Sequence, residues 1–459
     1  MKNVVKKITL LLIVFGIGVG VTLLYTNNKY KVYEEEEPKQ IKKHVDTISM
    51  MLETEANSGN YEMTTRSEWP TEGYVFNSEL SKCEHGSELS WDDTNKRVVM
   101  SGNVPDKCYV YFDIKPQVLL ADYVKSLYTG TQGANYIYYH DASLTNGAND
   151  NSYRFAGASD VVNNYVCFGS TTPCPTDNLY RIIGVFGDKV KLIKADYATT
   201  ALLGGDGDYK QAYTATGYSS SSYKGNNLAN VAAYTWNYKN DTSINSGKGS
   251  NTWSTSLLNK TNLNQNFITK IGADWAAKID TTTWKVGGNT YDNIQYQPAK
   301  TAYQNEIVSP VTTNTTDNAT TYSAKIGLMY ASDYGFAASP SAWTASLNTY
   351  NGEAIKNVNW MYMGLYEWTV SRIADDAYVV FYVYNTGSVN NNSANFAIAV
   401  RPVFYLTSSV NYASGSGSAT DPISINWLTD SFGKASVKPS KNEVNSSTYV
   451  ERFASFFEL

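Results

Sequence analysis

The chain contains 459 residues with a net charge of −5, and charged residues make up only 17% of it, against about 25% in typical globular proteins. No basic cluster occurs in the body of the chain, which excludes nucleic acid and anionic lipid as binding partners there. The 37 tyrosines and the many Asn, Ser and Gly residues are typical of adaptable recognition surfaces, and equally of exported proteins that stay soluble with few charges.

An apolar, uncharged segment near the N-terminus predicts a membrane span. Residues 8–25 carry no charged side chain and follow Lys2, Lys6 and Lys7. As a helix they extend over roughly 27 Å, enough for the hydrocarbon core of a bilayer. We therefore expect an uncleaved signal anchor, with the membrane as a partner through residues 8–25. A cleaved signal peptide is the alternative, but the apolar run is long for one and residues 22–25 contain no A-x-A-like cleavage site.

The four cysteines form two sequence-local pairs, Cys83 with Cys108 and Cys167 with Cys174. Each pair lies beside strand-like sequence, so two disulfides are expected. A zinc site would require C-x-x-C knuckles or nearby histidines, and the three histidines are scattered. Four reduced, buried cysteines are the remaining alternative. Because disulfides persist outside the cytosol, we expect a single-pass cell-membrane protein with its C-terminal body extracellular.

Composition divides the chain into five regions. A run of four glutamates followed by Pro38 is typical of a solvated spacer. Beyond it, short runs of β-branched and aromatic residues predict a small β-domain. The predicted regions are a cytoplasmic tail and transmembrane signal anchor (1–25), a charged stalk (26–45), a small β-domain (46–115), a larger α+β domain (116–428) and a C-terminal tail (429–459).

The larger domain is predicted from strands, then helices, then strands, an order that favours the α+β class. Residues 179–186 and 189–194 are strand-like segments joined by Gly187-Asp188, a two-residue loop that begins with glycine, and they form the clearest β-hairpin of the chain. Other predicted elements are helices at 117–128, 251–260 and 264–279, and a late hairpin of 378–384 and 396–406 around an asparagine-rich tip at 385–395. Long low-complexity loops, among them 204–223, mark binding surface or disorder.

Seven segments of the larger domain resemble known sequences. They are 151–157 (NSYRFAG), 163–168 (NNYVCF), 179–186 (LYRIIGVF), 253–259 (WSTSLLN), 326–332 (IGLMYAS), 367–372 (EWTVSR) and 400–406 (VRPVFYL). As a set they resemble uncharacterised, membrane-anchored bacterial surface proteins with a domain distantly similar to the C-type-lectin-like fold of sulfatase-modifying factors. The resemblance implies a lectin-like fold for the larger domain, in which Trp368, Arg372 and Arg401 have structural roles.

The chemistry of that fold does not carry over to this chain. Sulfatase-modifying factors are oxidases that work through a cysteine pair late in the fold. In this chain no cysteine follows Cys174. Calcium-dependent lectins use E-P-N or Q-P-D with a downstream W-N-D, whereas residues 297–299 read Q-P-A and no W-N-D occurs. His140 is the only histidine in the larger domain, too few for a Ser-His-acid set, and nucleotide-binding loops are absent. We therefore expect no catalytic residues, no metal, no cofactor and no nucleotide partner.

The predicted function is binding or adhesion at the cell surface, through a lectin-like head that recognises an extracellular glycan or protein. The residues expected to contact the ligand lie in late aromatic loops and in the asparagine-rich tip: Trp343, Tyr350, Trp360, Tyr362, Asn390, Asn391 and Asn392. A structural cell-envelope protein without a specific ligand is the first alternative. An enzyme acting on envelope polymers through Glu367 or Asp375 is the second.

Overall fold

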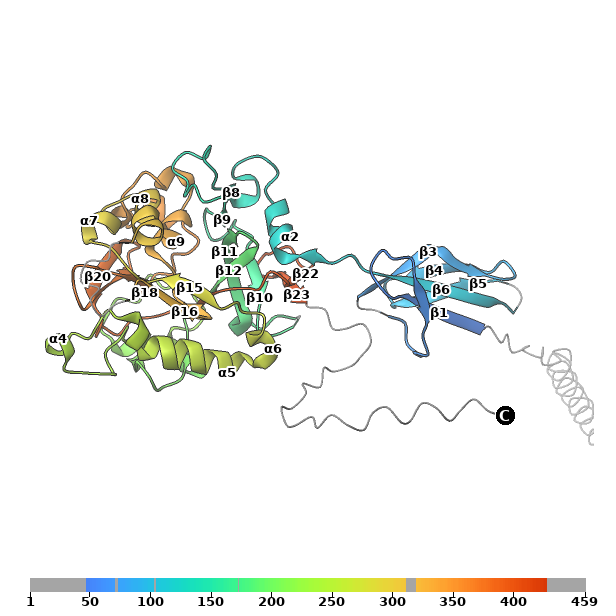
Figure 1. The fold of residues 1–459 in the computed structure, drawn as a ribbon, viewed down its shortest axis with the longest axis horizontal. Helices are drawn as coiled ribbons and strands as arrows, with labels where there is room; N and C mark the ends of the chain where they lie inside the picture. The colour runs from blue at the N-terminus through green and yellow to red at the C-terminus, as the bar shows by residue number, and fades with distance from the viewer. Residues whose placement is uncertain (1–46, 71–72, 103–104, 172, 311–318, 427–459) are drawn as a thin grey trace, which may run out of the picture. The chain divides into compact units, whose positions relative to one another are not determined.

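The computed structural model describes residues 47–70, 73–102, 105–171, 173–310 and 319–426, which are drawn in colour in Figure 1. The chain divides into two compact units, Met1–Pro116 (unit 1) and Gln117–Leu459 (unit 2), and each contains a buried apolar core of its own. The predicted tail and anchor at 1–25, the stalk at 26–45 and the C-terminal tail at 429–459 lie outside the described residues.

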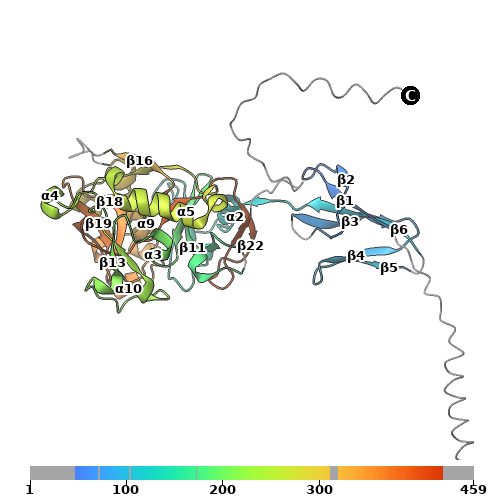
Figure 2. The ribbon, with the colours of Figure 1, turned by 90° about the horizontal axis from the view of Figure 1, so that it is seen from below.

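Unit 1 consists of a four-stranded sheet and a two-stranded hairpin. The sheet has the order β2-β1-β6-β3, with β1 parallel to β6, and the β4-β5 hairpin lies beside it (Figure 2). Val110 and Phe112 point inward from β6, as the two-residue period of a strand dictates, and Trp91 of the hairpin packs on Phe112. The strands are β1 (Thr47–Glu53), β2 (Tyr61–Met63), β3 (Tyr74–Cys83), β4 (Glu88–Asp92), β5 (Arg97–Ser101) and β6 (Lys107–Ile114).

Both predicted disulfides are present, and they include all four cysteines. Cys83 of β3 lies directly opposite Cys108 of β6 in the sheet register and is bonded to it, while Cys167 is bonded to Cys174. The sequence separations are 25 and 7 residues. In the chain-entropy model the longer loop corresponds to about 3.5 kcal/mol of stabilisation. That contribution matters because few buried residues form the core of unit 1.

Unit 2 is organised around a seven-stranded sheet whose middle is the predicted hairpin. Its order is β17-β21-β12-β11-β9-β8, and β10 also pairs with β11. Strands β11 (Leu179–Phe186) and β12 (Lys189–Lys194) turn at Gly187, whose φ of +67° is one that side-chain-bearing residues rarely adopt. Both strands are buried along most of their length. The other strands of this sheet are β8 (Ile137–Tyr139), β9 (Tyr153–Phe155), β10 (Tyr165–Cys167), β17 (Ile326–Gly327) and β21 (Val403–Tyr405).

Smaller sheets and short helices surround this sheet. Helices α7, α8 and α9 gather on one side of unit 2, and α5 and α6 run along the opposite side (Figure 1). The α-helices are α2 (Leu120–Ser126), α3 (Thr200–Leu203), α4 (Ile244–Gly247), α5 (Ile268–Ile271), α6 (Ala273–Ala276), α7 (Tyr291–Ile294), α8 (Ala299–Tyr303), α9 (Ala331–Phe336) and α10 (Glu353–Lys356); the π-helices are η6 (Leu258–Phe267) and η7 (Gln304–Val308).

The remaining elements are equally short. The strands are β7 (Val118–Leu119), β13 (Tyr209–Ala212), β14 (Ala232–Tyr234), β15 (Thr282–Lys285), β16 (Thr321–Ala324), β18 (Glu367–Arg372), β19 (Val379–Val383), β20 (Val389–Ser393), β22 (Asn411–Ser414) and β23 (Ser424–Asn426). The 3-10 helices are η1 (Ala134–Tyr136), η2 (Thr176–Asn178), η3 (Tyr213–Ala215), η4 (Leu228–Asn230), η5 (Trp253–Thr255), η8 (Pro340–Ala342) and η9 (Leu347–Thr349).

The predicted fold class is wrong. In place of an α+β protein with a transmembrane helix and a C-type-lectin-like domain, the described residues form a mixed α/β structure of many small sheets and few, short helices. The predicted helix at 264–279 shows one reason. It is interrupted at Gly272, whose φ of +83° ends the helical path, and its first part belongs to the π-helix η6. Side-chain periodicity predicts one continuous helix and does not detect these breaks.

The predicted localisation, a single pass through the cell membrane with the body extracellular, is also contradicted. Across the described ranges, no helix is both long enough and apolar enough to cross a bilayer. The segment predicted to do so, residues 8–25, lies outside those ranges.

Candidate ligand-binding site

The four aromatic side chains predicted to contact ligand are buried. Trp343, Tyr350 and Trp360 have no exposed surface, and Tyr362 has 2%. Their N–H and O–H groups donate to backbone carbonyl oxygens inside unit 2 at 2.5 to 3.2 Å. The surface role predicted for them is therefore corrected. Large rings whose single polar atom reaches an internal carbonyl belong to the core.

The predicted asparagine-rich tip is part of a strand. Asn390, Asn391 and Asn392 lie in β20, which pairs along its length with β19, and all three are half-buried. The Asn391 amide donates to Gln295 Oε1 at 2.7 Å. A strand requires only that backbone groups pair, so polar side chains did not prevent one here. The asparagines and the buried aromatic residues consequently form no common exposed surface.

Trp368, Arg372 and Arg401 are all buried and hold other parts of unit 2 in place. The Trp368 indole donates to the Tyr234 carbonyl at 2.9 Å, and Arg372 Nε donates to the Val286 carbonyl at 2.8 Å. Arg401 donates to a carboxylate, that of Glu367. His140 is buried as well, and desolvation lowers its pKa well below the ordinary value. Arg372 lines a hollow with no room for a ligand, and the other three side chains are buried in the core.

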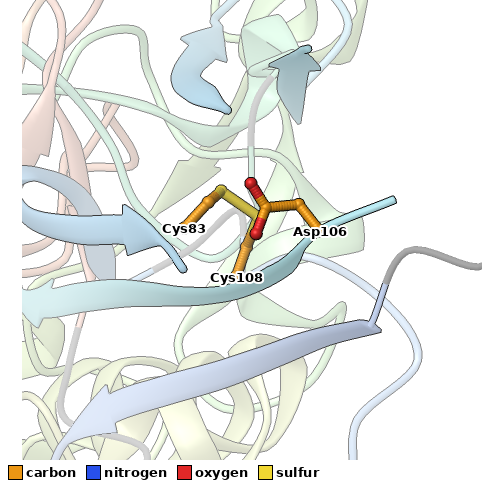
Figure 3. Close-up of side chains that lie close together, drawn as sticks. All are labelled: Cys83, Asp106 and Cys108. Atoms are coloured by element: carbon orange, nitrogen blue, oxygen red, sulfur yellow. A yellow bond between two sulfur atoms is a disulfide. The ribbon is translucent and has the colours of Figure 1, made fainter. Parts of the chain in front are cut away.

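One group of potential metal ligands lies in unit 1. Oxygen and sulfur atoms of Asp106, Cys83 and Cys108 lie within 4.8 Å of one another (Figure 3). The two sulfurs are bonded to each other, so neither is the thiolate that a metal requires. The Asp106 carboxylate accepts backbone N–H groups of His85 and Ser87, and these bonds hold its pKa well below the usual range. The Asp106 carboxylate therefore stabilises the turn that contains His85 and Ser87.

A cleft of about 600 Å³ lies in unit 2, and its volume falls within the roughly 300–1,000 Å³ of small-ligand sites. Its walls come from segments that are far apart in the sequence: the end of β12, the η2 turn behind the second disulfide, α3, the η4 turn and the end of α5. Tyr209 and Tyr223, from the predicted loop at 204–223, also line it.

Lys194 lies at the buried side of this cleft. It is the last residue of β12 and is 5% exposed. Its ammonium lies 5.7 Å from the centre of the Tyr180 ring and makes no hydrogen bond or ion pair with any part of the chain that the structure describes. Burial lowers its pKa, which Asp196 and Asp177 partly oppose. The cleft thus contains a cation that no protein anion contacts.

Asp196 builds one wall of the cleft. Its carboxylate accepts hydrogen bonds from the Tyr223 hydroxyl at 2.8 and 2.9 Å, from the Asn226 backbone N–H at 2.9 Å and from the Tyr197 N–H at 2.7 Å. Gly225 allows this close approach, because a Cβ there would overlap both the carboxylate and the Tyr223 hydroxyl. The carboxylate therefore fixes the loop that carries the polar rim of the cleft.

The rim and walls combine amide groups with aromatic rings. Asn226 and Asn230 are exposed at the rim, and their side-chain amides have no partner among the residues described. Tyr180 and Tyr197 are buried beneath the cleft, whereas Tyr209 is half-buried in its wall. The site therefore offers free donors and acceptors beside apolar ring faces.

No family model matches the chain, and neither a curated protein nor a solved structure is significantly similar to it. The resemblance to membrane-anchored bacterial surface proteins therefore stays a prediction. The residues of the cleft were not among the predicted site residues. One signal was available: Lys194 directly follows Leu192 and Ile193 in a predicted strand of the sheet centre, where a buried charge must be paired or bind a ligand.

Proposed function

We propose that the chain is a saccharide-binding protein whose ligand occupies the cleft in unit 2. The observation that carries this proposal is a cleft of about 600 Å³ that is lined by tyrosine rings and edged by asparagine amides without a partner among the described residues. The expectation of a glycan or protein ligand is thereby narrowed to a glycan.

The size of the cleft favours a small ligand over a protein partner. Stable protein interfaces bury about 1,600 Å² across a broad surface, whereas a concave site of a few hundred cubic ångströms encloses a small molecule. Among small molecules, a short saccharide combines many hydroxyl groups with flat, apolar C–H faces.

The lining matches both properties of a sugar ring. An asparagine amide provides two N–H donors and an acceptor, so Asn226 and Asn230 can each bind two neighbouring hydroxyl groups. The ring of Tyr209 provides a flat apolar surface against which a sugar face packs. The Asp196 bonds hold the rim in position before the ligand arrives, which lowers the entropy cost of binding.

The test is binding of the purified full-length chain to a glycan array, followed by titration calorimetry with the strongest ligand. Asn226→Ala and Asn230→Ala should each weaken binding about five- to tenfold, as expected for the loss of a neutral hydrogen bond. Asn240→Ala is the matched control, because Asn240 is exposed and lies outside the cleft. Equal affinities for all three variants would contradict the assigned site.

The same experiment addresses the two alternatives. A structural protein without a ligand would bind no saccharide on the array. An enzyme would release products from the bound glycan, and its activity would disappear on changing Glu367 or Asp375. Glu367 is unsuited to that role because Arg401 occupies both of its carboxylate oxygens.

A further inference from the structure

Six lysine and arginine side chains are buried in the described part of unit 2: Arg154, Arg181, Lys191, Lys194, Arg372 and Arg401. Three of them contact a carboxylate. Arg154 binds Asp150, Lys191 binds Asp333 and Arg401 binds Glu367. Arg181 and Arg372 donate to uncharged oxygens of the protein. Lys194 is the exception, because its ammonium has no oxygen partner among the described residues.

Lys194 differs from the other five cations in its surroundings. Lys194 lines the cleft without an acid partner, whereas Arg154 and Lys191, which line a smaller cavity of about 170 Å³, are each bound to an aspartate. Two carboxylates line the same cleft, yet neither forms an ion pair with Lys194. Asp196 is engaged by Tyr223 and by two backbone N–H groups, and Asp177 is exposed on the η2 turn, where solvent screens its charge.

Because Lys194 is 5% exposed and reaches water only in part at the cleft, its ammonium loses most of its hydration without a protein hydrogen bond or an opposite charge to offset that cost. A lysine at this position is explained if an anion completes its coordination when the ligand binds. A charge-assisted N–H···O bond in a partly dry cleft is among the stronger polar contacts that a protein makes.

We propose that the saccharide bound in the cleft is acidic and that its carboxylate binds the ammonium of Lys194. This inference rests on the proposed saccharide-binding function and names the class of sugar: uronic or sialic acids. Lys270, which is exposed and also lines the cleft, offsets the negative charge of the exposed Asp177, so that this carboxylate repels an acidic ligand less.

The experiment compares each acidic saccharide with its own methyl ester on the full-length chain. The probes are tetragalacturonate, a hyaluronan tetrasaccharide and sialyllactose, each as the free acid and as the ester, measured by titration calorimetry. At least one acid should bind about tenfold or more tightly than its ester, the difference expected for one charge-assisted hydrogen bond.

Substitution then locates the contact. Lys194→Met keeps the aliphatic stem and removes the charge, so the affinity for the acid should fall to that for the ester. Lys194→Arg should keep the preference for the acid. Lys260→Met is the control, because Lys260 is an exposed lysine outside the cleft. Thermal unfolding checks that each variant is folded, and the comparison of acid with ester on the unchanged chain needs no variant.

Three results would each overturn a statement made above. If acids and esters bind equally, saccharide binding stands and the carboxylate contact is wrong. If no acid, ester or neutral glycan on the array binds, the proposed function itself is wrong. A preference for the acid that survives Lys194→Met in a folded protein places the carboxylate elsewhere and also overturns the inference.

Discussion

Glu367 and Arg401 form a buried, bidentate ion pair. Arg401 Nε donates to Glu367 Oε1 at 2.7 Å and Arg401 Nη2 donates to Glu367 Oε2 at 2.8 Å, and both side chains are at most 2% exposed. Arg401 also donates to the Met361 carbonyl at 2.7 Å. The pair joins β18 to the segment that leads into β21, so it connects the smaller sheet of β18, β19 and β20 to the central sheet.

Removing one partner of this pair is expected to destabilise unit 2 strongly. Glu367→Gln leaves the Arg401 charge buried without an anion, which costs about 3–5 kcal/mol in comparable pairs. The measurement is the free energy of unfolding in urea. Glu353→Gln is the control: Glu353 pairs with Lys356 at 2.5 Å but is exposed, so its loss should change stability little. Similar effects for both variants would contradict the role given to burial.

Glu306 is expected to make stability depend on pH. Burial is the main cause that raises its pKa from 4.5 to about 7, although the N–H groups of Ala331 and Ser332 and the Ser371 hydroxyl bond to the carboxylate. The folded protein therefore holds this proton more tightly than the unfolded chain. Its contribution to stability is fully present below about pH 4.5 and is lost as the pH rises through about 7.

The expected size of that loss is about 3 kcal/mol, since each pKa unit corresponds to 1.36 kcal/mol. It is measured as the difference in unfolding free energy between the unchanged chain and Glu306→Gln at each pH from 4.5 to 8. This difference should fall with rising pH. The corresponding difference for Glu353→Gln should stay flat between pH 5 and 7, because hydrogen bonds from Lys356 and Asn357 lower the pKa of Glu353. A flat curve for Glu306→Gln as well would contradict the assignment.

Local sequence signals predicted the local parts of this fold. The β11–β12 hairpin follows from two strand-like segments around the Gly187 turn, and the two disulfides join cysteines only 25 and 7 residues apart. The errors arose where distant segments meet. Residues 396–406 were expected to pair with 378–384, but β19 pairs with β20 and β21 pairs with β12. Such choices depend on long-range pairing that period and propensity do not encode.

The candidate site was missed for the same reason. Lys194 and Asn230 line one cleft only because β12 and the η4 turn are brought together in the folded chain. The aromatic residues that were chosen instead illustrate a second difficulty. Trp343 and Trp360 look like exposed contact residues in polar loops, yet each donates its N–H to an internal carbonyl. Sequence alone does not show whether a buried carbonyl is available to an indole.

The Cys167–Cys174 disulfide is expected to affect ligand binding more than its short loop suggests. The η2 turn directly after Cys174 forms part of the cleft wall. Replacing both cysteines with serine should cost about 2 kcal/mol of stability for a separation of 7 residues, and it should also weaken saccharide binding several-fold because the wall is no longer fixed.

The disulfide of unit 1 provides the matched control. Replacing Cys83 and Cys108 with serine should cost more stability, about 3.5 kcal/mol for a separation of 25 residues, without changing affinity for the ligand. Titration calorimetry and thermal unfolding of both double variants separate these effects. If the unit 1 variant lost affinity to the same extent, the argument that links η2 to the cleft would be wrong.

Gly225 is expected to control the shape of the cleft rim. In Gly225→Ala, the new methyl group would overlap the Asp196 carboxylate and the Tyr223 hydroxyl, so the loop must move and the Asn226 N–H bond to Asp196 is lost. Binding should weaken by about tenfold, roughly 1.4 kcal/mol, because the rim is no longer held in position before the ligand binds and the entropy cost of binding rises. Gly205→Ala is the control, because the nearest atom to its new methyl group is Tyr209 Cδ1 at 4.0 Å. Equal affinity of both variants, measured by calorimetry, would show that the Asp196 wall does not shape the site.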